Sequence, residues 1–172
     1  VLKNLVIDNP SGVELDQNMQ VQQQITLMEG VLQTGNYTLT LGSSTSNICQ
    51  LNSDKGALSG NIKIWFGQGN FDKLNFPVSD LVATHNIEFI LKEIAYQKGM
   101  LELAYADGIP DDSRKSPFAA RQVVVALTQH GHFSAMLSNG PDEAGFKLSK
   151  MEEGKNYSQK VIWDIIKKSD VN

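Results

Sequence analysis

The sequence predicts an all-β fold with two parts: a short, parallel β-solenoid-like segment (residues 1–58) and an antiparallel, β-sandwich-like domain (residues 59–172). Pairs of apolar residues two positions apart recur through the first forty residues, which is typical of short strands with one buried face. Turn-forming Gly, Asn, Asp and Ser separate these pairs. Later strand candidates are longer and joined by short loops, as in a β-sandwich.

The spacing of the early apolar pairs favours stacked, parallel strands. Val13 and Ile25 are 12 positions apart, as are Met19 and Val31. Strands this short do not form stable hairpins alone, but stacking them as turns of a solenoid buries a continuous apolar column. The sequence therefore predicts parallel stacking at a 12-residue repeat, with an antiparallel meander of short strands as the alternative.

The rest of the chain is expected to alternate between loops and longer strands. Residues 43–56 are rich in Ser, Thr and Asn, which predicts a loop. Alternating or β-branched runs predict strands at 61–66, 86–94, 98–105, 122–127, 133–137 and 161–166. We expect 86–94 to pair with 98–105, and 122–127 to pair with 133–137. The boundary between the two parts falls near residues 58–78.

Composition excludes several classes of protein. The 172 residues are 41% hydrophobic and 20% charged with a net charge of −4, which argues against disorder. Mild acidity argues against nucleic-acid binding, which needs a basic patch. No apolar run approaches the ~20 residues that span a bilayer. No leader-like segment opens the sequence, so we expect any signal peptide to lie outside it.

No sequence motif indicates a reaction. Cys49 is the only cysteine, which excludes an intrachain disulfide, and its apolar neighbours favour a small buried thiol. The carboxylates show no spacing that singles out the pair a glycosidase needs. The Gly-x-Ser-x-Gly, P-loop and Gly-x-Gly-x-x-Gly motifs do not occur. We therefore expect the chain not to be an enzyme.

Two groups of residues could hold a metal ion. On a strand, His130 and His132 would point to the same face, where they could share a metal with a carboxylate. Oxygen-rich loops suit Ca²⁺, and a turn-rich loop carries Asp107, Asp111 and Asp112. The alternatives are two solvent-facing histidines and a solvated turn. His85 stands alone, and we expect no cofactor other than such a cation.

A cluster of aromatic and polar residues is the candidate ligand site. Sugar rings stack on exposed aromatic faces, and their hydroxyls exchange hydrogen bonds with amides and donate hydrogen bonds to carboxylates. Such side chains lie together in one segment: Trp65, Phe66, Gln68, Asn70, Phe71 and Asp72. The alternative is that Trp65 or Phe66 anchors the junction between the two parts of the chain.

The order of short motifs resembles a recurrent segment of repeat-bearing surface and secreted proteins of the type IX secretion class. The opening of that segment is similar to Gly12-Val13-x-Leu15, Ile25-Thr26-Leu27, Gly30-x-Leu32-x-Thr34-Gly35 and Leu39-Thr40-Leu41-Gly42. Its continuation is similar to Ser59-Gly60-x-Ile62, Trp65-Phe66 and Phe76-Pro77-Val78. Two positions depart from the pattern, because Ile64 replaces a basic residue and Ser79 replaces a glycine.

The resemblance covers residues 4–78 and carries over no catalytic residues. It implies a bacterial cell-surface or secreted chain, a solenoid stretch followed by a sandwich-like part, and a piece of a longer protein. We expect an extracellular, non-catalytic structural or adhesion module, whose partners are polysaccharide or other surface proteins. A carbohydrate-binding module is the alternative, followed by a secreted polysaccharide-active enzyme domain. The oligomeric state is left open.

Overall fold

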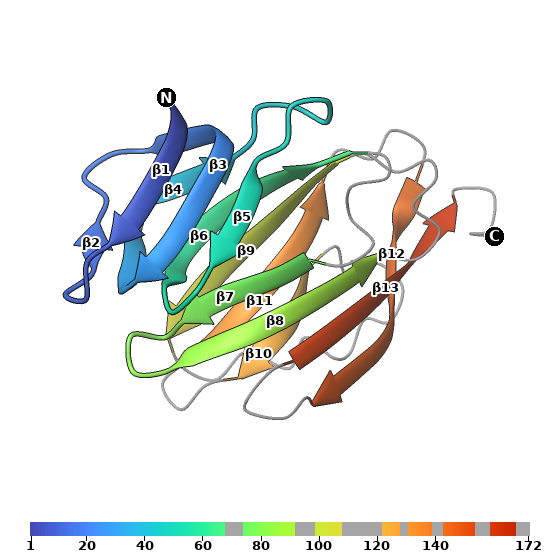
Figure 1. The fold of residues 1–172 in the computed structure, drawn as a ribbon. Coiled ribbons are helices and arrows are strands. Elements are labelled where there is room, and N and C mark those ends of the chain that lie inside the picture. Colours follow the sequence, from blue (N-terminus) through green and yellow to red (C-terminus); the bar gives the residue numbers. More distant parts are fainter. Residues whose placement is uncertain are drawn as a thin grey trace.

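The chain folds into a mixed β-sheet that curls into a half-barrel (Figure 1). The computed structural model describes residues 1–67, 74–91, 99–107, 122–127, 131–138, 143–153 and 159–167, with side chains in 1–67, 75–87 and 99–105. Within these ranges every regular element is a strand. The all-β prediction is therefore confirmed.

The described strands form one 13-stranded sheet. In chain order they are β1 (Leu2–Asp8), β2 (Val13–Glu14), β3 (Met19–Glu29), β4 (Val31–Leu41), β5 (Gln50–Ser53), β6 (Ala57–Phe66), β7 (Leu74–Ser79), β8 (Thr84–Leu91), β9 (Gly99–Asp107), β10 (Gln122–Leu127), β11 (Gly131–Ser138), β12 (Glu143–Glu153) and β13 (Gln159–Lys167). Hydrogen-bonded neighbours run in the order β1-β3-β4-β6-β7-β8-β13-β12, with the other strands branching from this path.

The strands before residue 67 pair in parallel along three ladders. The first ladder joins β1, β3 and β5 and aligns Leu5, Ile25 and Leu51. The second joins β2, β4 and β6 and aligns Val13, Leu32 and Leu58. The third joins the first residues of β3 to the ends of β4 and β6, and it aligns Met19, Leu39 and Ile62. In-register apolar side chains thus form three continuous columns.

The 12-residue repeat is wrong, although the pairing is parallel as expected. Val13 lies beside Leu32 rather than Ile25, and Met19 lies beside Leu39 rather than Val31. The chain contributes to all three ladders before it returns to the same one. Neighbouring residues of one ladder are therefore 19 or 20 positions apart in the sequence at the start of the chain, as Leu5 and Ile25 also show. β4 has a bulge between Gln33 and Thr38, where it pairs with β6.

The core lies between these columns. Ile25, Leu32 and Leu39, the middle members of the three ladders, are completely buried. The same cluster continues through Ile62, Phe76 and Leu103 into the later strands. Burial of a Leu or Ile side chain contributes about 1.5–3 kcal/mol, so the middle of the ladders is a major source of stability.

After residue 66 the pairing becomes mainly antiparallel. β9 pairs with β6 and β11, β10 with β11, β7 with β8, and β12 with β13, while β8 and β13 are parallel. The expected pairing of 122–127 with 133–137 is confirmed as β10 with β11. The expected hairpin of 86–94 with 98–105 is wrong, because β8 and β9 take other partners. The loop expected at 43–56 contains β5.

The predicted domain boundary between residues 58 and 59 falls inside β6. This strand pairs in parallel with β4 on one side, and its other side pairs with β7 and β9. The strands of the two predicted domains are therefore joined by backbone hydrogen bonds along β6. The division into domains stays a prediction.

Candidate functional site

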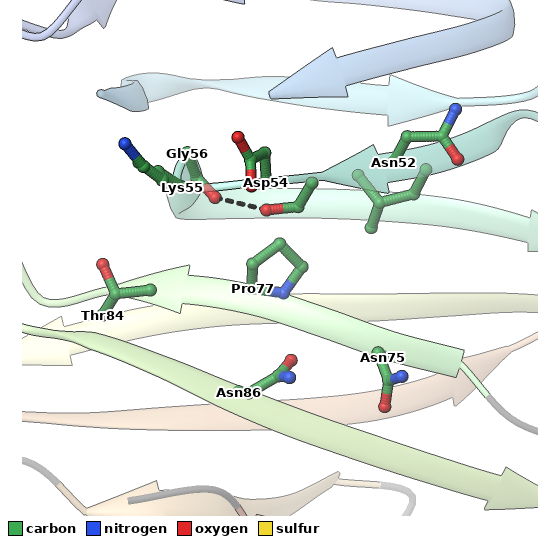
Figure 2. Close-up of a pocket in the computed structure, with 10 residues that line it drawn as sticks. Asn52, Asp54, Lys55, Gly56, Asn75, Pro77, Thr84 and Asn86 are labelled. Atoms are coloured by element: carbon green, nitrogen blue, oxygen red, sulfur yellow. Dashed lines mark hydrogen bonds between the residues drawn. The ribbon is translucent and has the colours of Figure 1, made fainter. Parts of the chain in front are cut away.

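A polar groove lies between β5 and the β7–β8 pair (Figure 2). Its volume is about 660 Å³, and its lining residues are Leu51, Asn52, Ser53, Asp54, Lys55, Gly56, Asn75, Pro77, Thr84 and Asn86. The groove exists because the three ladders end differently. β7 extends the second ladder and β9 extends the third, whereas β5 ends the first among the described strands.

The wall formed by residues 53–56 is held firmly against β3. The carbonyl oxygen of Leu27 accepts the backbone N–H groups of Asp54 and Gly56 at 3.0 and 3.2 Å. The hydroxyl of Ser53 donates to the carbonyl oxygen of Gly56 at 2.7 Å, which closes the turn (Figure 2). A side chain at Gly56 would meet the Leu27 Cβ at 2.7 Å, so this close approach requires glycine.

The opposite wall is the antiparallel pair β7 and β8. Pro77 is in register with Asn86, and Ser79 is in register with Thr84. Alternation along the strands sends Phe76, Val78 and Ile87 into the core. Asn75, Thr84 and Asn86 are left exposed and line the groove on the β7–β8 side (Figure 2).

The amide groups of the groove are available to a ligand. Asn52 extends from one wall, and Asn75 and Asn86 extend from the other. All three are exposed, and none of their side chains hydrogen-bonds to another described residue. Each amide offers two N–H donors and one carbonyl acceptor. Most small-molecule sites are lined by apolar side chains, so this lining suits a hydroxyl-rich or amide-rich ligand better.

The aromatic cluster expected from the sequence is divided by the structure. Phe66 is 2% exposed and belongs to the hydrophobic core, so its ring offers little face for a ligand to stack on. Its burial fits the alternative of an anchoring role. Trp65 points to the other side of β6, is half-buried and packs beside Gly42. The remaining predicted positions lie outside the described residues: Gln68, Asn70, Phe71 and Asp72.

The predicted metal ligands are only partly covered by the structure. In the β9–β11 register Asp107 lies beside Gly131, and His132 lies beside Ala106. These two backbone positions therefore occupy adjacent rows at one end of the sheet. His130, Asp111 and Asp112 lie outside the described residues. Across the described part of the chain, no group of three or more His, Cys, Asp or Glu side chains is arranged to hold a metal. The metal site stays a prediction.

A carboxylate–histidine pair in the β7–β8 turn escaped the sequence analysis. The Oδ2 atom of Asp80 lies 3.6 Å from Nε2 of His85, and both side chains are largely buried. Oδ1 of Asp80 accepts the backbone N–H groups of Val82 and Ala83 at 3.0 and 2.8 Å. This turn also places Leu81 at a φ of 71°, a conformation that costs energy for leucine. The only sequence signal for this pair was an aspartate five positions before a histidine.

Cys49 is a buried thiol, as the sequence predicted. It is 6% exposed and belongs to the hydrophobic core. Burial raises its pKa to about 11, although hydrogen bonds from the backbone of Gly42 and Ile25 oppose the shift. A thiol with this pKa is almost fully protonated at neutral pH and is a poor nucleophile.

No protein-family model, curated protein or solved structure matches this chain. In the part of the chain that the structure describes, no helix is long and apolar enough to cross a membrane. The physical properties of the groove and of the strand edges are therefore the basis for a functional proposal.

Proposed function

We propose that this chain is a non-catalytic, extracellular structural or adhesion module of a larger bacterial surface or secreted protein. The polar groove carries the proposal, because it presents unpaired amides beside the edge of β5. An extended polymer can lie along such an edge and exchange hydrogen bonds with both walls. The motif order of residues 4–78, which resembles type IX secretion surface proteins, supports the location.

The finer architecture belongs to the same proposal. We propose that residues 1–58 are turns of a short β-solenoid and that residues 59–172 form a β-sandwich-like domain. The three parallel ladders support the solenoid, since each joins strands separated by a full circuit of the chain. The mainly antiparallel pairing of the later strands supports the sandwich-like part.

Carbohydrate binding is the second candidate, and the chemistry of the groove favours it. Asparagine amides donate to and accept from sugar hydroxyls at once. Thr84 adds a hydroxyl, and Asp54 adds the one carboxylate among the described lining residues. A glycosidase would need a pair of carboxylates in the site, so these residues do not supply its machinery.

A binding assay with groove variants tests both candidates. Purified protein is applied to a glycan array and to insoluble polysaccharides, and beads coated with it are tested for adhesion to protein-coated surfaces. The double variant Asn52→Ala/Asn86→Ala removes one amide from each wall. Two lost hydrogen bonds, at about 0.5–1.5 kcal/mol each, should weaken polysaccharide binding by about 5- to 150-fold.

Matched controls separate the groove from other surfaces. Asn36→Ala removes an exposed amide from the bulge of β4 and should leave binding unchanged. Trp65→Ala tests the aromatic site expected from the sequence. If Trp65→Ala abolishes binding while the groove variant retains it, the groove is not the site. Failure of the wild-type protein to hold any polysaccharide removes the carbohydrate candidate, and failure to adhere to either type of surface contradicts the adhesion role.

A further inference from the structure

Two rows of uncharged side chains cross the outer face of β3 and β5. In the first row Gln24 of β3 is in register with Gln50 of β5, and in the second row Thr26 is in register with Asn52. Ile25, which lies between the rows on β3, is completely buried, so the side chains of both rows point away from the core. Asn52 also lines the groove, and the rows therefore lead directly to it.

The side chains of these rows are available to a ligand. Gln24, Gln50 and Asn52 are exposed, and Thr26 is half-buried. In the described part of the chain the four side chains make one hydrogen bond, from Nε2 of Gln24 to Oγ1 of Thr26 at 3.1 Å. Amides and hydroxyls both donate and accept hydrogen bonds. Because the rows carry no charge, they suit an uncharged, hydroxyl-rich ligand and offer an ionic polymer no countercharge.

The spacing of the side chains matches a sugar chain that crosses the strands. Neighbouring strands lie about 4.8 Å apart, which is close to the length of one sugar in an extended β-1,4-linked chain. The two rows lie about 6.6 Å apart along each strand, so they can flank such a chain on both sides. On β1 the same rows continue with Asn4 and Val6. Successive sugars would therefore meet side chains of successive strands.

We propose that an extended, uncharged β-1,4-linked polysaccharide binds across β3 and β5 and enters the groove at Asn52. The inference rests on the proposed carbohydrate binding and extends the site beyond the groove. Within the groove the sugar chain reaches Asn75 and Asn86 of the opposite wall (Figure 2). A polypeptide partner would instead lie along the β5 edge, where its backbone could pair with that strand. A polysaccharide has no peptide backbone, so the rows of side chains set its direction.

The length of the oligosaccharide tests this direction. Isothermal titration calorimetry compares disaccharides with hexasaccharides of β-1,4-linked glucose, mannose and N-acetylglucosamine. A hexasaccharide should bind more tightly than the disaccharide of the same sugar, because only the longer chain fills the groove and also reaches β3. Maltohexaose is the control for shape, since its α-1,4-linked chain curves and should not bind detectably.

Variants of the rows test the residues. Gln24→Ala/Gln50→Ala should lower the affinity for the hexasaccharide by about 5- to 150-fold and leave the affinity for the disaccharide unchanged. Asn52→Ala/Asn86→Ala should weaken the binding of both, because it alters the groove itself. The matched control Gln17→Ala/Asn36→Ala removes two exposed amides outside the rows and should change neither affinity. Circular dichroism verifies that the variants are folded.

The possible outcomes separate this inference from binding in the groove alone. Equal affinities for the disaccharide and the hexasaccharide would overturn the path across the strands and leave the groove as the site. A Gln24→Ala/Gln50→Ala variant that binds the hexasaccharide as tightly as the wild type would do the same. If maltohexaose binds as tightly as the β-1,4-linked chains, or if none of these chains binds, the inference is overturned. Adhesion to protein-coated surfaces would still support the structural or adhesion role in that case.

Discussion

The buried hydroxyl of Thr34 offers a sensitive test of the packing between β4 and β6. Its Oγ1 atom accepts the backbone N–H of Asn61 at 2.7 Å, and Thr34 is completely buried. Gly60 lies against the same hydroxyl with a φ of 101°, and a Cβ at this position would collide with Oγ1. The hydroxyl therefore occupies the space that the glycine leaves free, where the bulge of β4 meets β6.

Thr34→Val keeps the shape of the side chain but removes the acceptor. The N–H of Asn61 is then left without a partner, which should lower the free energy of unfolding by about 1–3 kcal/mol. Thr34→Ser keeps the acceptor and loses one methyl group, at a cost of about 0.8 kcal/mol. Urea unfolding followed by tryptophan fluorescence measures both variants. The reasoning is refuted if Thr34→Val is as stable as the wild type or more stable than Thr34→Ser.

Three further predictions concern the core, the thiol and the β7–β8 turn. Leu39→Ala should cost about 2–5 kcal/mol in urea unfolding, and Leu5→Ala, at the half-buried end of a ladder, should cost clearly less. Cys49 should resist thiol reagents at pH 8 until the chain is unfolded. Because burial raises its folded pKa to about 11 from the ordinary value of 9.0, stability relative to Cys49→Ala should be constant below about pH 9 and fall as the pH rises toward 11. Asp80→Ala leaves two backbone N–H groups of the turn unpaired and should lower the melting temperature, whereas Asp80→Asn, which keeps an acceptor oxygen, should lower it less.

The sequence was sufficient for strands whose signal is local. The β-branched run at 122–127 predicted β10 and its partner, because the pairing needs only a short connection. Alternation of Ile62 and Ile64 with polar residues predicted the inward face of β6 in the same way. β5 was missed because Leu51 is its only apolar side chain.

The register and the groove depend on contacts that sequence patterns do not record. Apolar pairs two positions apart mark a buried face but not where the chain bends between ladders, so the repeat length was wrong. The hairpin expected for β8 and β9 failed because each strand has a long-range partner that a local turn signal does not reveal. The groove side chains come from strands more than 20 residues apart, as Asn52 and Asn75 show, and each is individually an ordinary polar residue.

The groove follows from the way the ladders end among the described strands. β5 is the last strand of the first ladder, whereas the second and third ladders continue into β7 and β9. The groove amides therefore lie beside a strand edge and are not part of the packing that holds the ladders together. Because Asn52 and Asn86 are exposed and hydrogen-bond to no other described residue, Asn52→Ala/Asn86→Ala should change the free energy of unfolding by no more than about 0.5 kcal/mol per site. A larger loss in urea unfolding would mean that these amides support the fold and are not available to a ligand.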